Sequence, residues 1–192
     1  QRADGFVRGE GAGSAVLSLT PARRFSMKIC ARGSAVRQDG RSASLTAPSG
    51  QAQRELLGAA HADVISDREC IDCLETHGTG TVLGDPIEFG STSSCMLADR
   101  TVPSGGAASS SLKPDVPLVL CGVKANSGHG ESAAGSIGAA KLLLSLADYR
   151  STPNAQLRTL NRYISASRNT CAMLTQVAGK CPYSVNGGVS SF

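Results

Sequence analysis

Short apolar runs alternate along the chain with longer stretches in which apolar and polar residues are mixed. Two runs with the length and composition of strands, 13–19 and 26–36, come first, and the second ends near a turn-forming stretch. Residues 49–64 follow with helix-forming residues after Pro48 and apolar positions at Leu56, Leu57, Ala60 and Val64. This part of the chain therefore predicts two strands and then a helix.

The same alternation continues toward the C-terminus. Residues 69–78 return to a strand pattern, and 85–99 read as a helix that starts with Asp85 as N-cap, Pro86 at the first helical position and Glu88 at the third. A Ser/Gly/Pro-rich stretch then indicates a surface loop. The remaining expected elements are a loop at 100–115, a buried strand at 116–124, a helix at 131–148 and a last strand at 187–192. A repeated order of strand, loop and helix predicts an α/β fold with its functional residues on loops beyond strand ends.

Composition limits the classes of protein to consider. The chain has 192 residues, of which 41% are hydrophobic, so one ordinary domain with a packed core is expected. The net charge is +4, but only Arg23 and Arg24 are adjacent basic residues and no aromatics interleave with the rest, which argues against nucleic-acid binding. No apolar stretch approaches the roughly 20 residues of a membrane span.

Seven irregularly spaced cysteines do not form the pattern of a secreted disulfide framework, and a reducing compartment fits them better. We expect a cytoplasmic location by default, with the compartment left open because the chain begins at Gln1. Cys70 and Cys73 form a C-x-x-C, but residues three apart on a strand point to opposite faces. No metal site is therefore expected.

Two of the three histidines lie in equivalent places. His77 follows one predicted strand and His129 follows another, each just before a helix start, and loops on neighbouring strands would bring the two imidazoles together. A single loop histidine would more often cap a turn, but two in matched contexts indicate an active site. Histidine suits proton exchange near neutral pH because its reference pKa is about 6.5. Lys124, five positions before His129, is placed to orient that ring or tune its charge state.

At these residues the sequence resembles a known family. The stretches "ETHGTGTVLGDPIE" (75–88) and "VKANSGHGESAAG" (123–135) are similar to the two histidine motifs of β-ketoacyl synthases, specifically the ketosynthase domains of type I polyketide synthases. Three further blocks, at 4–19, 32–53 and 187–192, also resemble the family, and all five blocks occur in the family's order. The resemblance covers nearly the whole chain.

This resemblance implies a thiolase-like fold with layered α-β-α-β-α packing, of which this chain would form a part. Residues 1–28 would be the end of the N-terminal half, 29–148 the C-terminal half with both histidine motifs, and 149–192 an extension that leads into a truncated final strand. The implied reaction is a decarboxylative Claisen condensation. A cysteine thiolate receives an acyl chain, malonyl on an acyl carrier protein loses carbon dioxide, and the resulting carbanion attacks the acyl thioester.

The resemblance also assigns roles to residues. His77 and His129 would be catalytic, promoting decarboxylation and donating hydrogen bonds to the enolate oxygen, and Lys124 would support His129. Thr79 and Thr81 would contact the phosphopantetheine arm, although their hydroxyls could equally hydrogen-bond the turn backbone. No metal or directly bound organic cofactor is implied, because the substrates are carried on the phosphopantetheine of acyl carrier protein. A homodimer is implied for the parent protein.

Departures from the family leave alternatives open. None of the seven cysteines matches the family's nucleophilic-cysteine block, so this piece alone is not expected to condense substrates, and Cys95 falls well inside a predicted helix. Ser127 and Gly130 differ from the usual residues beside His129, which keeps a non-elongating or scaffold partner as an alternative. A glycine-rich phosphate or nucleotide module is a further class, but Gly78, Gly80 and Gly84 miss the G-x-G-x-x-G spacing by one residue.

Overall fold

The computed structural model describes residues 5–19, 29–40, 47–65, 71–97, 116–155, 157–165, 170–175 and 186–192. The helices are α1 (Gly50–Ile65), α2 (Gly84–Thr92), the π-helical turn η1 (Ser93–Leu97), α3 (Lys124–Ser127), the 3₁₀ turn η3 (Glu131–Ala133) and α4 (Ala134–Asp148). The strands are β1 (Cys73–Glu75), β2 (Leu118–Cys121), β3 (Cys171–Ala172) and β4 (Gly187–Val189).

The four strands form one parallel sheet in the order β3-β2-β1-β4. In the central pair Leu74 lies opposite Leu120, and Glu75 lies opposite Cys121. Parallel strands end at the same edge of a sheet, so the loops that leave β1 and β2 are neighbours. The expected α/β organisation is confirmed, and it places the two histidine loops side by side.

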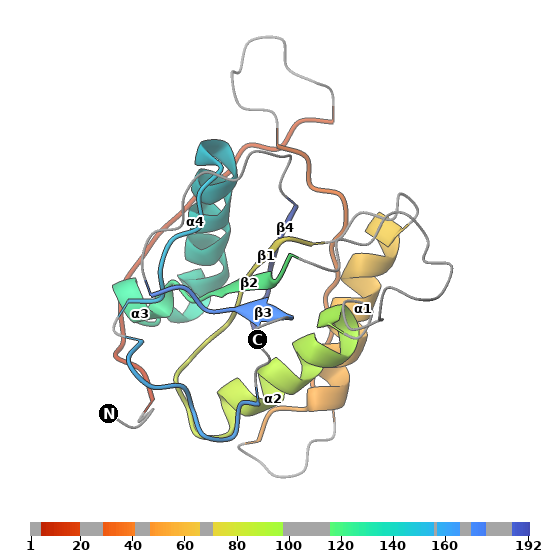
Figure 1. Ribbon diagram of the computed structural model, residues 1–192. Coiled ribbons are helices and arrows are strands. Elements are labelled where there is room, and N and C mark those ends of the chain that lie inside the picture. Colours follow the sequence, from red (N-terminus) through yellow and green to blue (C-terminus); the bar gives the residue numbers. More distant parts are fainter. Residues whose placement is uncertain are drawn as a thin grey trace.

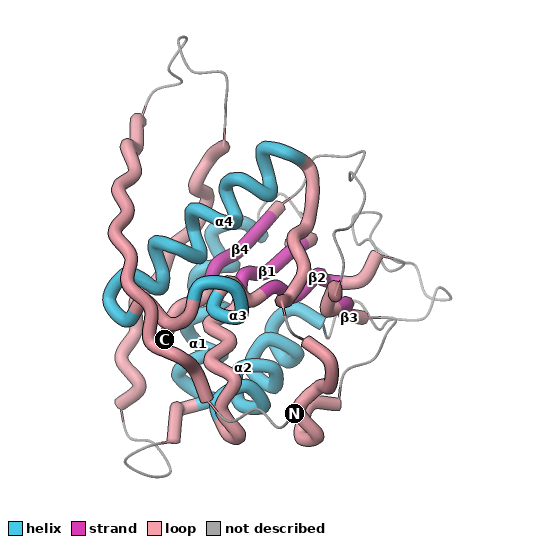
Figure 2. Tube along the Cα trace, turned by 90° about the vertical axis from the view of Figure 1, so that its left-hand side faces the viewer, coloured by secondary structure: helices cyan, strands magenta, loops and turns pink. Residues whose placement is uncertain are grey.

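Helices cover both faces of this sheet (Figure 1). In Figure 1, α4 lies on one side of the strands, with α1 and α2 on the other, and Figure 2 shows the same arrangement after a quarter turn. Successive strand residues point to opposite faces, so Leu74 of β1 joins the core toward α2, while its neighbour Glu75 faces α4, where it meets Lys141. The main core contains Leu74, Leu97, Leu118, Leu120 and Cys171, with Ile71, Phe89, Met96 and Met173 packed against it.

The helix predictions are largely correct. α1 covers 50–65 against the predicted 49–64, and the Ser49 hydroxyl caps it by accepting the Ala52 N–H at 3.2 Å. α4 begins three residues later than predicted, because Glu131–Ala133 adopt a 3₁₀ turn first. The helix predicted from Asp85 begins at Gly84 and continues into the π-helical turn.

Two strand predictions near the N-terminus are wrong over the described residues. The structure assigns no strand to 13–19 or to 29–36, and Val16 and Leu17 are 97% and 86% exposed. A β-compatible run becomes a strand only when a neighbouring strand pairs with it. Residues 26–28 and 100–115 lie outside the described ranges. β3 was not predicted, because two residues give no readable periodicity.

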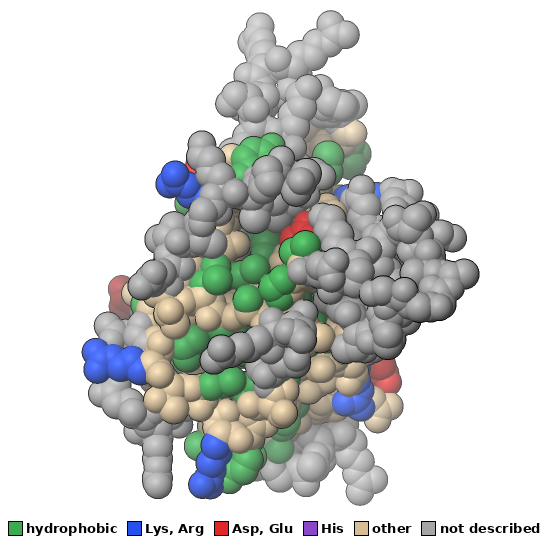
Figure 3. Space-filling view, in the orientation of Figure 1, with side chains coloured by type: hydrophobic (Ala, Val, Ile, Leu, Met, Phe, Trp, Pro, Cys, Tyr) green, Lys and Arg blue, Asp and Glu red, His purple; other side chains and the backbone are tan. Residues whose placement is uncertain are grey.

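Two further observations concern the charged side chains on the surface and the apolarity of the helices. On the face drawn in Figure 3, hydrophobic side chains gather over the middle of the molecule, whereas the Lys and Arg side chains lie apart from one another near its edges. None of the helices in the described ranges combines the length and the apolarity needed to cross a bilayer.

Candidate active site

The histidine loops meet at the carboxyl edge of the sheet. His77 follows β1 by two residues, and His129 follows β2 and the short helix α3. The two imidazole rings lie 5.4 Å apart, centroid to centroid, at an angle of 86°. Parallel pairing of β1 with β2 thus brings the two rings together, as the matched sequence contexts predicted.

The surroundings of His77 define its protonation. Its Nδ1 accepts the backbone N–H of Phe192 at 3.2 Å and lies 3.3 Å from Nζ of Lys124. Both neighbours are donors, so Nδ1 must be the unprotonated nitrogen and the ring proton must lie on Nε2. Burial, followed by the positive charges of Lys124 and His129, lowers the pKa of His77 to about 4. His77 is therefore a neutral imidazole with an Nε2–H donor at pH 7.

His129 has the same tautomer as His77, but a different backbone donor fixes it. Its Nδ1 accepts the backbone N–H of Glu131 at 2.9 Å, which again leaves the proton on Nε2. Burial and the charge of Lys124 lower the pKa of His129, and the Glu131 carboxylate partly opposes them. The Phe6 ring lies 4.5 Å from the imidazole, centroid to centroid. A chain segment far from His129 in sequence therefore forms one wall of the site, which no sequence pattern indicated.

The backbone of residues 5–9 ties the two loops to each other. The Gly5 N–H donates to the Gly80 carbonyl at 3.0 Å, next to His77. Further along, the His129 N–H donates to Val7 at 2.8 Å, and the Gly9 N–H donates back to the His129 carbonyl at 2.9 Å. This short segment therefore bridges the loop after β1 and the loop after α3.

Lys124 lies differently from the prediction. Its ammonium contacts His77, whereas the sequence predicted that it would support His129. The reason is geometric: α3 turns the chain between Lys124 and His129, so the lysine side chain projects toward the β1 loop. Lys124 is 8% exposed, and burial lowers its pKa while the Glu88 and Glu75 carboxylates oppose that shift. Its charge acts on both histidines, as their lowered pKa values show.

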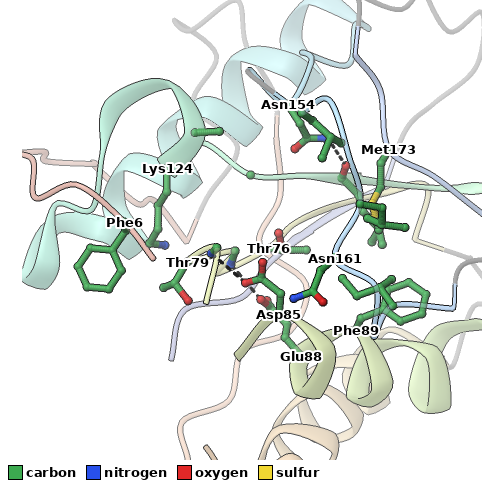
Figure 4. A pocket seen from close by; sticks show the side chains of 18 of the residues that line it. Phe6, Thr76, Thr79, Asp85, Glu88, Phe89, Lys124, Asn154, Asn161 and Met173 are labelled. Carbon is green, nitrogen blue, oxygen red and sulfur yellow. Dashed lines mark hydrogen bonds between the residues drawn. The ribbon is translucent and has the colours of Figure 1, made fainter. Parts of the chain in front are cut away.

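Two carboxylates of α2 hold the loop that carries His77. Glu88 accepts the His77 N–H at 2.7 Å and the Gly78 N–H at 2.9 Å, and it also accepts the Ser190 hydroxyl at 3.0 Å. Asp85 accepts the Gly80 N–H at 3.0 Å. Figure 4 shows both side chains directed from α2 toward this loop. Burial raises the pKa of each carboxyl, and the backbone N–H donors oppose that rise.

These contacts correct the predicted capping box. Asp85 and Glu88 do not cap their own helix. Thr81 does so, because its hydroxyl accepts the Gly84 N–H at 3.0 Å. The contacts also argue against a phosphate cradle. The loop N–H groups of His77, Gly78 and Gly80 already donate to carboxylates, whose negative charge would repel a phosphate.

The loop borders two pockets. One, the His77 pocket, measures about 540 Å³ and includes Gln53, His77, Thr79, Thr81, Leu83 and Phe192 in its lining. The other, the Lys124 pocket, measures about 480 Å³ and includes Phe6, Thr76, Thr79, Phe89, Lys124 and Asn154 (Figure 4). Thr79 lines both, and its hydroxyl lies 3.3 Å from that of Thr81. Thr81 therefore has the structural role that the sequence left open, and both threonines border the pocket that holds His77.

The described cysteines lie elsewhere. Cys73, Cys121 and Cys171 are buried, and none of the five described cysteines lines either pocket. Burial raises the pKa of Cys95, and it raises that of Cys121 to about 11, so both favour the thiol over the nucleophilic thiolate. No group of three or more metal-ligating side chains occurs within the described ranges.

Glu88 gives a direct test of how the loop is held. A Glu88→Gln variant keeps one acceptor oxygen but points an NH₂ group at a second donor, so one of the two loop N–H groups loses its acceptor. Such a loss costs about 1–3 kcal/mol, or roughly 5- to 150-fold in local opening. We expect a peptide spanning 76–82 in the full-length protein to exchange its amide hydrogens faster by a factor in that range, as measured by mass spectrometry.

The matched control is Glu55→Gln on α1, where the exposed side chain accepts a hydrogen bond from Gln51 on the same helix. It should leave exchange in 76–82 unchanged. Equal exchange in Glu88→Gln and the unsubstituted protein would show that Glu88 does not hold the loop.

Comparison with known proteins is consistent with this geometry. Residues 29–158 match the family described as beta-ketoacyl synthase, C-terminal domain. One phenolphthiocerol/phthiocerol polyketide synthase protein of Mycobacterium tuberculosis is 42% identical over 165 residues, which is 84% of this chain and 8% of that protein. Another component of the same synthase, from the same organism, is 42% identical over 179 residues, 91% of this chain and 10% of that protein. The chain thus spans about a tenth of the length of these relatives or less.

Solved structures agree on the fold. The ketosynthase from module 6 of the bacillaene synthase of Bacillus subtilis 168 has a TM-score of 0.63 at 28% identity, over 77% of this chain and 24% of that one. Ketosynthase twelve of the bacillaene polyketide synthase of Bacillus amyloliquefaciens has a TM-score of 0.69 at 26% identity, over 84% and 27%. The predicted thiolase-like α/β fold, present in part, is confirmed. The chain belongs to the beta-ketoacyl synthase family and carries the C-terminal domain of a ketosynthase of the polyketide synthase type.

Proposed function

We propose that this chain supplies the histidine side of a ketosynthase centre that condenses an acyl thioester with a malonyl thioester carried on acyl carrier protein. The observation that carries the proposal is the pair of neutral imidazoles 5.4 Å apart, each with its Nδ1 occupied by a backbone N–H. Two Nε2–H donors at one place suit an oxygen on which negative charge develops.

The proposed chemistry follows from that donor pair. When malonyl thioester loses carbon dioxide, the electrons of the breaking C–C bond move into the thioester carbonyl and form an enolate. Hydrogen bonds from His77 and His129 stabilise the enolate oxygen more than the uncharged carbonyl, and this difference lowers the barrier. The enolate carbon then attacks the acyl thioester carbonyl, and the thiolate that carried the acyl group leaves. The product is a β-ketoacyl thioester two carbons longer.

Lys124 has a distinct part in this proposal. A protonated histidine would also donate from Nε2, but it would lose the Nδ1 contact with the Phe192 N–H and would face the ammonium of Lys124. Burial and then the lysine charge favour neutral His77, and the Lys124 and Phe192 donors fix its tautomer. Lys124 is a positioning residue in this scheme, because it contacts the imidazole and not the reacting atoms.

The His77 pocket is the proposed entry for the phosphopantetheine arm. It reaches the His77 ring and is lined by both Thr79 and Thr81, which the family resemblance assigned to that arm. The Thr79 hydroxyl is placed to hydrogen-bond an amide of the arm, whereas Thr81 also keeps its helix-capping contact. Acyl carrier protein is thus the proposed partner, and phosphopantetheine arrives attached to it.

The acyl-accepting cysteine is proposed to come from the N-terminal half of the same domain. The described cysteines are buried, thiol-favouring or distant from the two pockets. In this division residues 1–28 close the N-terminal half, 29–148 form the C-terminal half, and 149–192 complete the sheet through β3 and β4. A homodimer is proposed for the whole protein, as the family resemblance implies.

Acylation of the full-length protein tests this assignment. Incubation with an acyl thioester followed by peptide mass spectrometry should place the acyl group on a cysteine other than Cys95, and Cys95→Ala should retain at least about half of the acylation. The same protein should release carbon dioxide from malonyl thioester. An acyl group on Cys95 would contradict the site, and decarboxylation without any condensed product would favour a non-elongating partner.

A further inference from the structure

Glu75, the last residue of β1, carries a buried carboxylate in the middle of the fold. It is 2% exposed, and one of its oxygens accepts the backbone N–H of Val123. The other lies 2.6 Å from Nζ of Lys141 on α4, and the two side chains are 3% and 13% exposed. The catalytic proposal above uses neither residue.

These contacts lie at the base of the site. Glu75 precedes His77 by two residues, and Val123 immediately precedes Lys124. The backbone carbonyl of Glu75 also accepts the Ser190 N–H at 2.9 Å, two residues before Phe192. Lys124 and Phe192 then meet at His77 Nδ1. Glu75 therefore connects the segments that carry His77, Lys124 and Phe192, and the contacts among these three residues define the tautomer of His77.

The buried Glu75–Lys141 contact is sensitive to the loss of either charge. A buried carboxylate without a partner must take a proton or move toward water, and an unpaired buried ammonium must do the same. Removing one member of the pair therefore disturbs the structure far more than replacing both with neutral groups of similar shape. Lys141 is consequently required to hold the Glu75 carboxylate against the Val123 N–H.

We propose that the Glu75–Lys141 ion pair is a positioning device that sets the place of α3, and with it the Lys124 ammonium, relative to His77. Glu75 acts on the loops of both histidines, since α3 leads directly into the turn of His129. The expected effect on catalysis rests on the proposed function, whereas the effect on the state of His77 does not.

The test compares four variants of the full-length protein: Lys141→Met, Glu75→Gln, the double variant Glu75→Gln/Lys141→Met, and Lys141→Arg. The readout is the rate at which diethyl pyrocarbonate, which reacts with unprotonated imidazole, modifies His77 as a function of pH, followed by peptide mass spectrometry. Among the described residues, the charged and titratable groups about His77 are Lys124 of α3, His129 of the following loop and Glu88 of α2, with Asp39 in the lining of the same pocket. Free imidazole in the same reaction serves as the reference for the reagent.

In the unsubstituted protein the pH of half-maximal rate for His77 should lie near 4. Both single variants should raise this midpoint toward the ordinary histidine value, so that for a midpoint near 6 the rate at pH 5.5, relative to the same variant's high-pH plateau, falls by about fourfold. The double variant should return to the midpoint of the unsubstituted protein, since Gln still offers an oxygen to the Val123 N–H. Lys141→Arg should remain within about half a pH unit.

A purely through-space effect predicts a different pattern. Losing the Lys141 charge would then raise the midpoint, but losing the Glu75 charge would lower it, so opposite shifts in the single variants would overturn the proposal, as would unchanged midpoints. If the single variants do not fold, the double variant and Lys141→Arg test the proposal. A His77 midpoint above pH 6 in either of them would overturn the positioning role. Arg8→Met, which removes the exposed Arg8–Glu131 ion pair beside His129, should leave the His77 midpoint unchanged.

Turnover provides the link to catalysis. In malonyl decarboxylation each single variant should lose at least about tenfold in kcat with KM within about twofold, and the double variant should recover most of it. If the unsubstituted protein releases no carbon dioxide, the proposed function fails, yet the His77 midpoints still test the positioning role. If it does and the single variants match it in kcat, the positioning role fails alone.

Discussion

Replacing either His77 or His129 with alanine in the full-length protein is expected to lower the rate of malonyl decarboxylation by roughly 10²- to 10³-fold. In the proposed function each substitution removes one Nε2–H donor from the oxygen on which enolate charge develops, and losing one such donor has an effect of that size in other enzymes. Release of radioactive carbon dioxide from labelled malonyl thioester measures it. KM should change little, because the donors act more strongly on the charged enolate than on the ground state.

The two substitutions should not combine multiplicatively, because both donors serve the same oxygen. His61→Gln is the matched control, since His61 lies on α1 and lines neither of the two pockets described. It should retain the rate of the unsubstituted protein within about twofold. A His77→Ala variant that decarboxylates at the normal rate would exclude the donor pair as the source of catalysis.

A Gly128→Ala substitution is expected to lower the stability of the fold around His129. Gly128, next to His129, has φ 76° and ψ −177°, a combination that is almost restricted to glycine. An added Cβ would also lie 2.9 Å from the Val7 carbonyl and 3.3 Å from the Gly9 nitrogen. Both neighbours are backbone atoms that bridge to His129, so they cannot yield without moving the histidine. We expect a loss of at least about 1–3 kcal/mol.

Pulse proteolysis in urea measures this loss within a longer protein. Gly90→Ala is the matched control, because Gly90 is an exposed position of α2 where an added Cβ would meet nothing within 4 Å. Alanine there should raise stability by up to about 1 kcal/mol through its higher helix propensity. A Gly128→Ala protein as stable as the Gly90→Ala protein would contradict the strained conformation at Gly128.

Local patterns predicted the elements that local forces build. α1 and α4 were found because apolar spacing and helix propensity act over a few residues, and the start of α2 was placed to within two residues. The run at 13–19 was misjudged for the opposite reason, since a strand depends on a partner that can lie anywhere in the chain. The capping box failed for another reason, because N–H groups of the loop that precedes α2 take Asp85 and Glu88 as acceptors in place of the helix N-terminus.

The candidate site shows the same division. The convergence of His77 and His129 was predictable, because two similar strand-to-loop transitions on parallel neighbours must open at one edge of the sheet. The partner of Lys124 was not, because α3 reverses the chain before His129. Phe6, Glu88 and Phe192 also escaped prediction. Phe6 and Phe192 reach the site from segments outside the two histidine motifs, whereas Glu88 shares a motif with His77 but was predicted only to start its own helix.

The sequence by itself determined the α/β class, the two histidine loops and the family to which they belong, since these depend on short patterns and on residue types at fixed spacing. Only the tertiary structure decided how the histidines are set for their task. Their tautomers follow from backbone donors at Phe192 and Glu131, and the lowered pKa of His77 follows from burial and Lys124. The Glu131 donor is local to His129, but Phe192 and Lys124 lie far from His77 in the chain, and folding alone places them beside its ring.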